Sequence, residues 1–312
     1  MMLKLLFCFL YILPLILSGC DSKEQENSFE YDLEQYQKTD PSLILYKEQE
    51  GIILSLNQVS GIAIDRQDNV YVAGDNSLLV FSPKGEKIAH KQLESNARCL
   101  AVDKDGTIYL AMKKNIDLYS SDFSSKKSWA DLPENSLFTS LVISESNIFL
   151  ADAANKIVLC FDKTGQLLHR IGNKDLSKGK EGLVIYQPHL DMVLGDPGKI
   201  WIVNPGKHRI ENYDYQGNLL SFWGEPSFRV EGFCGCCNPS HLSMLSNGNF
   251  VTSEKNLLRI KIYTKEGKFL GVVAGVESFA GNTQPSDIAV NSKDQIFVLD
   301  ARHKKIRIFQ SR

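Results

Sequence analysis

The sequence predicts an all-β fold of six similar units that close into a ring. Six segments share one order of features: an apolar strand, a tight polar turn, a second strand, a short polar loop and a third strand. They are residues 61–86, 99–123, 141–166, 191–218, 241–268 and 287–310. Most continue into a fourth short strand, as in LLHRIG, LLSFWG and FLGVVAG. Four-stranded units repeated at this length are typical of propeller blades, so we expect a six-bladed β-propeller over residues 42–312.

The first twenty residues predict an export signal. MMLKLLFCFLYILPLILSGC carries one cation at Lys4, then an apolar run broken by Pro14, then small residues before Cys20. The run is shorter than the roughly 20 apolar residues that span a bilayer. Residues 17–20, LSGC, resemble the lipobox of bacterial lipoproteins, which implies cleavage after residue 19 and a lipid on Cys20. The alternative is an ordinary cleaved signal with an unmodified Cys20.

A lipidated Cys20 would hold the chain outside the cytoplasmic membrane, on the periplasmic side or at the cell surface. Residues 1–19 are then the lipoprotein signal peptide. Residues 20–41 are acidic and poor in apolar side chains, which is typical of a flexible tether. The formal net charge of −2 provides no basic field, so nucleic acid is excluded as a partner. We expect contact with the membrane only through the lipid.

The sixth repeat ends with its third strand, IRIFQ, at residues 306–310. A fourth strand is therefore missing from this blade. SLILYKE, residues 42–48, is an isolated strand-like stretch before the first repeat. We expect it to pair beside IRIFQ and close the ring, because an unpaired edge would leave backbone groups exposed.

The direction of the chain predicts which loops share a face. If the first strand of each blade lines the channel, the connections between blades and the loops between second and third strands lie at one end. We call this end the upper face. FCGCCNPSH, residues 233–241, is a connection of this kind between the fourth and fifth blades. Loops on a rigid scaffold are where binding residues tend to lie.

Polar residues gather at the predicted channel mouth on the upper face. In the fourth, fifth and sixth blades the inner strand begins with Asp191, His241 and Asp287, and His189 lies two residues upstream of Asp191. Two carboxylates and an imidazole form a candidate site for a divalent metal. The loops between second and third strands add Glu254, Lys255, Asp300 and Arg302 as candidate ligand-binding residues. Of these, Lys255 and Arg302 favour an anionic ligand over a cation.

The cysteine loop permits three interpretations. Cys234, Cys236 and Cys237 lie within four residues, and an oxidising compartment favours a structural or redox-active disulfide between two of them. Three thiolates together with His241 are also a possible ligand set for zinc or Cu(I). Cys160 lies within an apolar strand and is expected to be a buried thiol.

Glycines and a proline precede each of the last three blades. Gly172, Gly179, Gly182 and Pro188 precede the fourth, Gly224, Gly232 and Pro239 the fifth, and Gly275, Gly281 and Pro285 the sixth. An inner strand follows, and then an acidic loop before a strand that ends in an aromatic residue. This pattern resembles the NHL repeat family, and the resemblance extends over about residues 42–312. The second unit departs from it, because Lys113 and Lys114 replace the aspartate.

The sequence lacks the nucleophile-elbow, zincin and phosphate-loop motifs. Peptide-amidating lyases, which are NHL-like, hold zinc with histidines of Pro-His motifs. This chain has one such motif, Pro188-His189, and serines at the matching positions 240 and 286. We therefore expect a membrane-anchored propeller that binds a protein, peptide or glycan on its upper face. The alternative is a metal-dependent hydrolase or lyase, or a thiol-redox protein, that uses the channel mouth and the Cys234–Cys237 loop.

Overall fold

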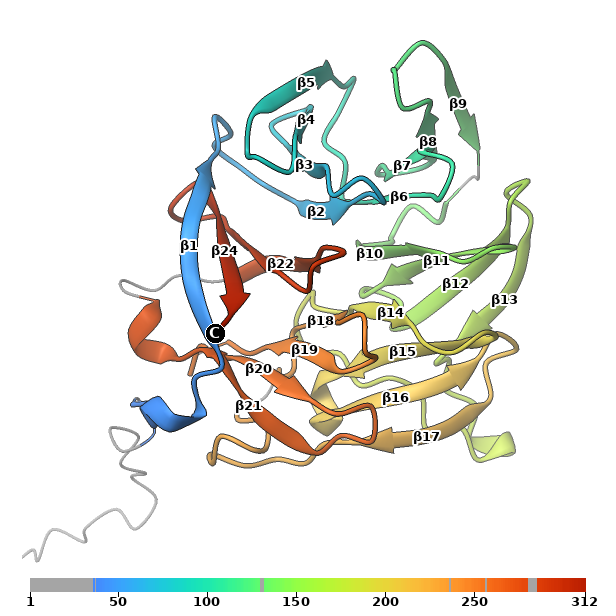
Figure 1. Cartoon of the computed structure of the whole chain (residues 1–312). Helices are drawn as coiled ribbons and strands as arrows, with labels where there is room; N and C mark the ends of the chain where they lie inside the picture. Colours follow the sequence, from blue (N-terminus) through green and yellow to red (C-terminus); the bar gives the residue numbers. More distant parts are fainter. Residues whose placement is uncertain (1–35, 37, 130–131, 236, 256, 280–284) are drawn as a thin grey trace, which may run out of the picture. The chain divides into compact units, whose positions relative to one another are not determined.

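The computed structural model describes residue 36 and residues 38–129, 132–235, 237–255, 257–279 and 285–312, which form a six-bladed β-propeller (Figure 1). Each blade is a sheet of four antiparallel strands, and the innermost strands contact one another in a closed circle. The predicted fold is thus confirmed. The expected signal peptide and nearly all of the tether lie outside the described residues. Within those residues, no helix is both long and apolar enough to cross a membrane.

The first three blades follow the chain from the inner to the outer strand. Their strands are β2 (Gly61–Ile64), β3 (Val70–Gly74), β4 (Ser77–Phe81) and β5 (Lys87–Gln92), then β6 (Cys99–Val102), β7 (Ile108–Ala111), β8 (Ile116–Tyr119) and β9 (Lys126–Trp129), then β10 (Phe138–Ile143), β11 (Asn147–Asp152), β12 (Ile157–Asp162) and β13 (Leu167–Ile171).

The fourth and fifth blades repeat this order, and the sixth takes its outer strand from the start of the propeller. The strands are β14 (Met192–Leu194), β15 (Lys199–Asn204), β16 (Arg209–Asp214) and β17 (Leu219–Trp223), then β18 (His241–Met244), β19 (Phe250–Ser253), β20 (Ile260–Tyr263) and β21 (Phe269–Ala274), then β22 (Pro285–Val290), β23 (Ile296–Asp300), β24 (Lys305–Ser311) and β1 (Tyr46–Ile53). Short 3-10 turns are η2 (Pro41–Leu43), η3 (Leu176–Lys178), η4 (Pro205–Lys207) and η5 (Val276–Ser278).

Local sequence explains the spacing of the strands. Glycines lie in the turn before the fourth strand of four blades, and all adopt the left-handed conformation, with φ between 81° and 94° at Gly85, Gly165, Gly217 and Gly267. Residues with a side chain rarely adopt this conformation, so glycine ends the third strand at the same point each time. The second strands carry apolar side chains that are buried against neighbouring blades, as in Val70–Gly74. These side chains form the cores between blades.

The sequence correctly predicted which strand the N-terminal closing strand pairs with, but not where the closing strand begins and ends. β1 pairs antiparallel with β24, yet it begins at Tyr46 and continues to Ile53, whereas residues 41–43 form η2. The register shifts between Gln49 and Ile52. Gly51 permits this bulge, because a Cβ there would lie 2.4 Å from the Ile306 carbonyl oxygen.

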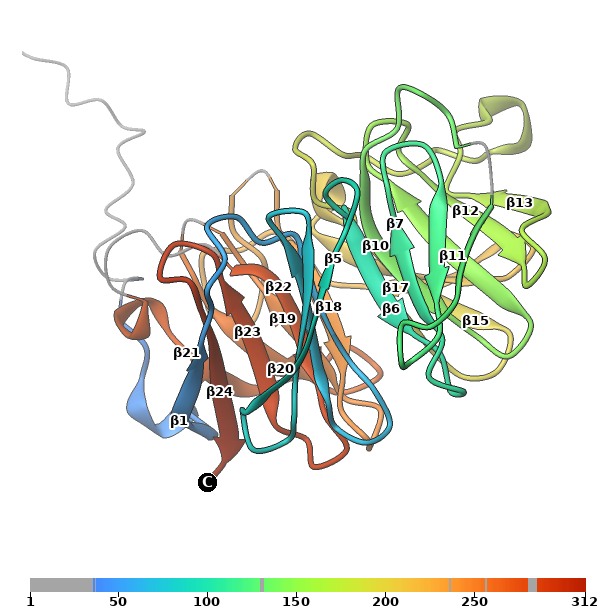
Figure 2. The ribbon, with the colours of Figure 1, turned by 90° about the horizontal axis from the view of Figure 1, so that it is seen from above.

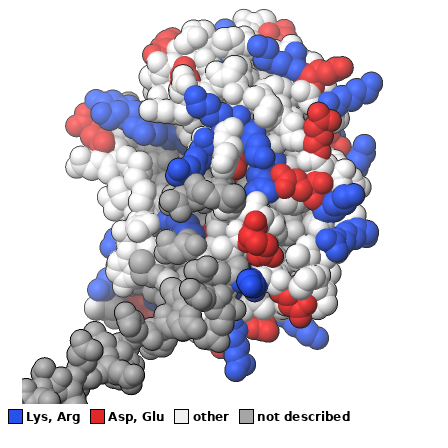
Figure 3. Space-filling view, turned by 90° about the vertical axis from the view of Figure 1, so that its left-hand side faces the viewer, with Lys and Arg blue, Asp and Glu red and all other residues white. Residues whose placement is uncertain are grey.

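Figure 2 shows the sheets from the side of the ring, with β1 and β24 next to each other. On the side shown in Figure 3, lysine and arginine side chains are interspersed with aspartates and glutamates. Since adjacent strands are antiparallel, the connections between blades share the upper face with the loops between second and third strands. The predicted placement of the connection between the fourth and fifth blades on this face follows from the observed topology, for residues 233–235 and 237–241.

Candidate functional site at the channel mouth

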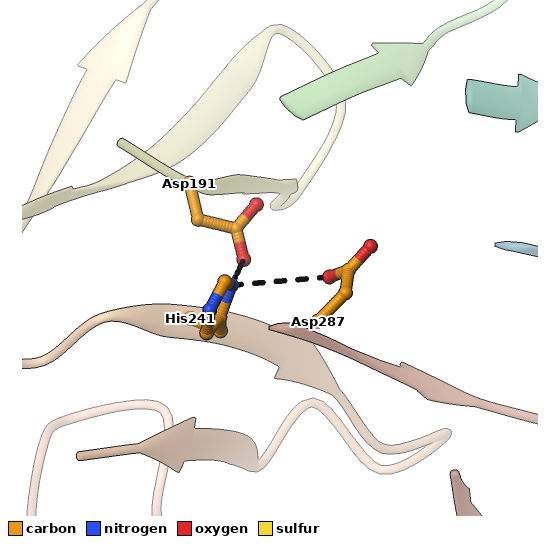
Figure 4. A group of neighbouring side chains, drawn as sticks. All are labelled: Asp191, His241 and Asp287. Carbon is orange, nitrogen blue, oxygen red and sulfur yellow. Dashed lines mark ion pairs between the residues drawn. The ribbon is translucent and has the colours of Figure 1, made fainter. Parts of the chain in front are cut away.

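Three titratable side chains from consecutive blades meet at the upper end of the channel (Figure 4). Asp191 directly precedes β14, His241 begins β18, and Asp287 lies in β22. Nδ1 of His241 is 3.7 Å from a carboxylate oxygen of Asp191 and 3.9 Å from one of Asp287. One donor atom from each residue lies within 4.8 Å of the other two. The structure thus brings together the three residues expected to form a metal site.

The two carboxylates are fixed by backbone donors. Each accepts a hydrogen bond from the next residue of its own strand and another from the inner strand of the following blade. The four bonds run from Met192 N to Asp191 Oδ1 at 2.8 Å, from Leu242 N to Asp191 Oδ2 at 2.8 Å, from Ile288 N to Asp287 Oδ1 at 2.8 Å and from Ile62 N to Asp287 Oδ2 at 3.0 Å. These bonds join neighbouring blades and hold both carboxylates in one orientation toward His241.

His241 is 8% exposed, and its Nε2 atom is buried without a hydrogen-bond partner among the described residues. The ring of His189 packs edge-on against it, with centroids 5.7 Å apart and an interplanar angle of 83°. Lys255 is also nearby, and its Nζ donates to Oε1 of Gln187 at 2.8 Å. Of the upper-face residues predicted from the sequence, His189 and Lys255 therefore lie beside the site of the two aspartates and His241.

Burial and mutual charge shift the pKa values in this group. Burial, followed by the charge of Asp191, raises the pKa of Asp287 to about 7. Burial tends to lower the pKa of His241, but the hydrogen bonding and charge of Asp191 and the charge of Asp287 outweigh it and raise that pKa. Burial, with His241 and Lys255 nearby, lowers the pKa of His189 to about 3. His189 is therefore a neutral imidazole at physiological pH.

The mouth opens on a cavity of about 300 Å³ inside the channel, lined by the inner strands of all six blades. Most of its lining is aliphatic, and Asp191 and Asp287 are its acidic groups. The exposed atoms of the lining are nevertheless more polar than apolar, so the cavity suits a polar group better than an apolar one.

The acidic residues of the loops between second and third strands have a different role. In four blades, a side chain at the end of the second strand accepts a hydrogen bond from the backbone of the preceding connection. These bonds run from Gln58 N to Asp75 at 2.9 Å, from Leu137 N to Asp152 at 3.1 Å, from Val184 N to Asn204 at 2.9 Å and from Cys234 N to Glu254 at 3.2 Å. We call these residues clasps, because each fixes a connection to its blade.

The sequence led us to expect that Glu254 and Asp300 would bind a ligand at the mouth. Neither side chain is open to a ligand there. Both are fully buried. Asp300 accepts hydrogen bonds from the backbone N–H of His303 and from its ring Nδ1. Arg302, in the loop between β23 and β24, is exposed. The Glu254 carboxylate is occupied by Cys234 N and Arg259, and that of Asp300 by His303.

Glu254 also belongs to a buried charge network that the sequence analysis missed. Arg259 Nε donates to Glu254 at 2.6 Å, and Nζ of Lys261 lies 3.3 Å from the same carboxylate. Lys261 also donates to the carbonyls of Val230 at 3.1 Å and Gly232 at 2.6 Å. Burial lowers the pKa of Lys261 to about 8. A lysine inside the apolar strand IKIY was the available signal, and its ammonium holds the start of the cysteine loop.

The cysteine loop is held by hydrogen bonds. Cys234 and Cys237 are buried, and no disulfide joins the four described cysteines, which are Cys99, Cys160, Cys234 and Cys237. Cys236 lies outside the described residues. Asn238 donates to the Cys234 carbonyl at 2.5 Å and accepts from the Lys255 backbone N–H at 2.7 Å. Burial, followed by the charge of Glu254, raises the pKa of Cys234, which disfavours its reactive thiolate form.

The NHL repeat model matches residues 282–309, which include most of the sixth blade. The sequence matches none of the curated proteins with which it was compared. A streptogramin B lyase structure is similar, with a TM-score of 0.62 and 12% identity, over 88% of this chain and 100% of that chain. A virginiamycin B lyase from Staphylococcus aureus is similar with a TM-score of 0.60 and 11% identity, over 85% of this chain and 99% of that chain. The WD40 β-propeller domain of Doa1 is similar with a TM-score of 0.56 and 16% identity, over 81% of this chain and 79% of that chain.

At these identities the solved structures show a shared fold and no more. The topology and the repeat match agree with one another, since the matched residues include the inner, second and most of the third strand of one blade. The chain is a six-bladed β-propeller whose last blade carries an NHL repeat.

Proposed function

We propose that this propeller is anchored outside the cytoplasmic membrane through a lipid on Cys20 and binds a protein, peptide or glycan on its upper face. The binding surface would be the sector of the fourth to sixth blades around the channel mouth. The LSGC sequence supports the anchor, and the residues of the mouth support the location of the binding surface.

One observation carries the proposal: clasps recur from blade to blade, whereas the mouth residues do not. A residue type that recurs at one position in successive blades supports the fold that all blades share. Asp191, His241 and Asp287 occupy positions where the first and second blades have Gly61 and Cys99. The third blade has Ser140 there, so only the last three blades place charged or titratable groups other than a buried thiol at this position. Asp191 and Asp287 also join neighbouring blades, but the His241 side chain has no such bond to a described residue, and we infer that the group marks a binding site.

The surface beside the mouth suits a partner. Tyr186, in the connection before β14, is 67% exposed, and its neighbour Gln187 is bound to Lys255. The connection is fixed, because Asn204 accepts from Val184 N at 2.9 Å. Exposed aromatic rings on a rigid loop contribute much of the binding energy at protein and carbohydrate interfaces, because little conformational entropy is lost.

A neighbour of similar fold adds general support. A catalytically inactive virginiamycin B lyase was solved with quinupristin, so that propeller holds a ligand. The alternative role, a metal-dependent hydrolase or lyase, would require a metal at the mouth. A thiol-redox role has less support, because Cys234 is buried and its pKa is raised.

The test is a binding screen of the full chain, purified in detergent, on peptide and glycan arrays, followed by calorimetry with any compound bound. We expect Tyr186→Ser to weaken binding by roughly tenfold or more. Phe222→Ser is the matched control, since Phe222 is 55% exposed on the outer strand β17. Equal effects of both substitutions, or no bound compound, would contradict the proposal.

A further inference from the structure

We propose that Asp191, His241 and Asp287 bind one divalent transition-metal ion of the Zn²⁺ type at the channel mouth. This inference goes beyond the proposed partner binding and does not depend on it.

The distances fit a site that closes slightly around an ion. Zinc binds nitrogen and oxygen ligands at about 2.0–2.2 Å, which places tetrahedral donors roughly 3.4 Å apart. Nδ1 of His241 lies 3.7 Å from Asp191 and 3.9 Å from Asp287. Both separations are longer than a good hydrogen bond but within ion-pair distance, so a metal would replace a loose contact between the imidazole and the carboxylates. The three donor atoms lie within 4.8 Å of one another, so the group would have to contract to bind an ion.

The ligands are already oriented. Each carboxylate oxygen at Asp191 and Asp287 accepts one backbone N–H, which leaves a further lone pair for a metal. Such outer contacts fix first-shell ligands in known metal sites. The backbone bonds come from four different inner strands, β14, β18, β22 and β2, so the ring itself orients the two carboxylates.

His241 supplies a second and independent observation. Its side chain is buried, and Nε2 has no hydrogen-bond partner among the residues that the structure describes. A buried imidazole normally has its ring orientation fixed by hydrogen bonds. Here Nε2 has none from the described residues, while Nδ1 lies between two carboxylates at ion-pair distance (Figure 4). Nδ1 is thus the nitrogen placed to share a metal ion with the two aspartates.

The donor set indicates the class of ion. Two carboxylates and an imidazole suit Zn²⁺ or Mn²⁺, whereas Ca²⁺ takes six to eight oxygen ligands and Cu(I) prefers sulfur. Lys255 lies near the group, and its charge, which the neutral amide of Gln187 does not cancel, lowers the affinity for a cation. The ring of His189 packs edge-on against that of His241. Three protein ligands leave a coordination position open toward the cavity that Asp191 and Asp287 line.

The first test measures Zn²⁺ binding by calorimetry to the full chain, purified in detergent and stripped with EDTA. We expect one ion per chain, and a loss of more than about 100-fold in affinity for both His241→Gln and Asp287→Asn, beyond the roughly 10- to 100-fold that supporting groups cost. His90→Gln is the control, because His90 lies on the outer strand β5, bonded to Ser77. Equal affinity in all four proteins, or no stoichiometric binding to the wild type, would overturn the proposal.

A second measurement keeps the proposal testable if a variant does not fold, which circular dichroism would show. The stripped wild-type chain is loaded with Co²⁺ and its absorption spectrum recorded. Visible bands of a nitrogen- and oxygen-ligated ion, without a sulfur-to-cobalt charge-transfer band, support the site. A charge-transfer band would place the ion on the cysteine loop and overturn the assignment. Neither readout depends on Tyr186, so failure of the partner screen and failure of the metal site remain distinguishable.

Discussion

Arg307 on β24 donates two hydrogen bonds to the carboxylate of Glu48 on β1, from Nε at 2.7 Å and from Nη2 at 2.5 Å. The two residues are 259 positions apart in the sequence. Arg307 is 5% exposed, and its guanidinium also lies over the rings of Phe279 and Phe309. The pair therefore couples the closing strand of the ring to the last strand of the chain.

Glu48→Gln should lower the free energy of unfolding by about 1–2 kcal/mol, because a charged hydrogen-bond acceptor is lost beside a buried guanidinium. The lower part of the usual range applies, since the Glu48 side chain is 37% exposed and solvent weakens the pair. Urea unfolding measures the change. Glu50→Gln is the control, because Glu50 is exposed on the same strand. A loss of equal size in both variants would contradict a specific role for the pair.

The same pair predicts a dependence on pH. The hydrogen bonds from Arg307 lower the pKa of Glu48 below its ordinary value of 4.5. A carboxyl whose pKa is lowered by folding stabilises the protein above its unfolded pKa, and this contribution disappears as the pH falls through the folded pKa. The difference in stability between wild type and Glu48→Gln should thus be constant near neutral pH and shrink below about pH 4.5. A difference that grows on acidification would refute this.

Glu254→Gln should be more damaging, with a loss of about 3–5 kcal/mol, because it leaves the cations of Arg259 and Lys261 buried without their partner. The loop that Lys261 holds should loosen at the same time. Limited trypsin digestion measures this as faster cleavage after Arg229, which is exposed. Glu225→Gln, on the surface of the same loop, should change neither quantity. Unaltered cleavage in Glu254→Gln would show that the network does not hold the loop.

The buried thiols should react slowly in the native chain. Burial raises the pKa of Cys99 and Cys234 and raises that of Cys160 to about 11, so little thiolate is present at neutral pH. In a Cys236→Ser variant, we expect iodoacetamide to modify Cys99, Cys160 and Cys234 only after unfolding in urea. Peptide mass spectrometry identifies the modified positions. Rapid modification of Cys234 in the folded chain would contradict this prediction and support a redox role for the loop.

Cys20→Ser should abolish lipid attachment. When the full chain is expressed in a bacterium fed with labelled palmitate, we expect label in the wild type and none in the variant. Cys8→Ser is the control, since Cys8 belongs to the predicted signal peptide. A wild-type chain that is cleaved without taking up label would favour the ordinary signal peptide.

Much of the architecture could be predicted from the sequence, because turns recur at one spacing and each turn glycine ends a strand at the same point. The extent of β1 could not. Its bulge at Gly51 depends on the approach of the Ile306 carbonyl, and that contact joins distant parts of the chain. No local pattern in residues 42–53 encodes it.

The sequence placed the inner-strand residues and Lys255 together, but it did not show that the Glu254 and Asp300 carboxylates are buried. Aligning the blades placed Asp191, His241 and Asp287 side by side, because rotation about the ring brings equivalent positions together. Glu254 and Asp300 were misplaced, since an acidic residue at a loop end reads the same whether it faces a ligand or a backbone N–H. Comparison between blades separates the two cases for Glu254, because Asp75, Asp152 and Asn204 bond a connection from the same position.

The pairing of β1 with β24 also has a consequence for synthesis. Residues 46–53 emerge early from the ribosome, but their partner strand, Lys305–Ser311, emerges after every other blade has been made. Until then β1 has no neighbour in its sheet, and five blades can assemble only as an open arc. Closure of the ring is thus the last step of folding during synthesis. A chain that stops before β24 would stay open, however well its first blades had folded.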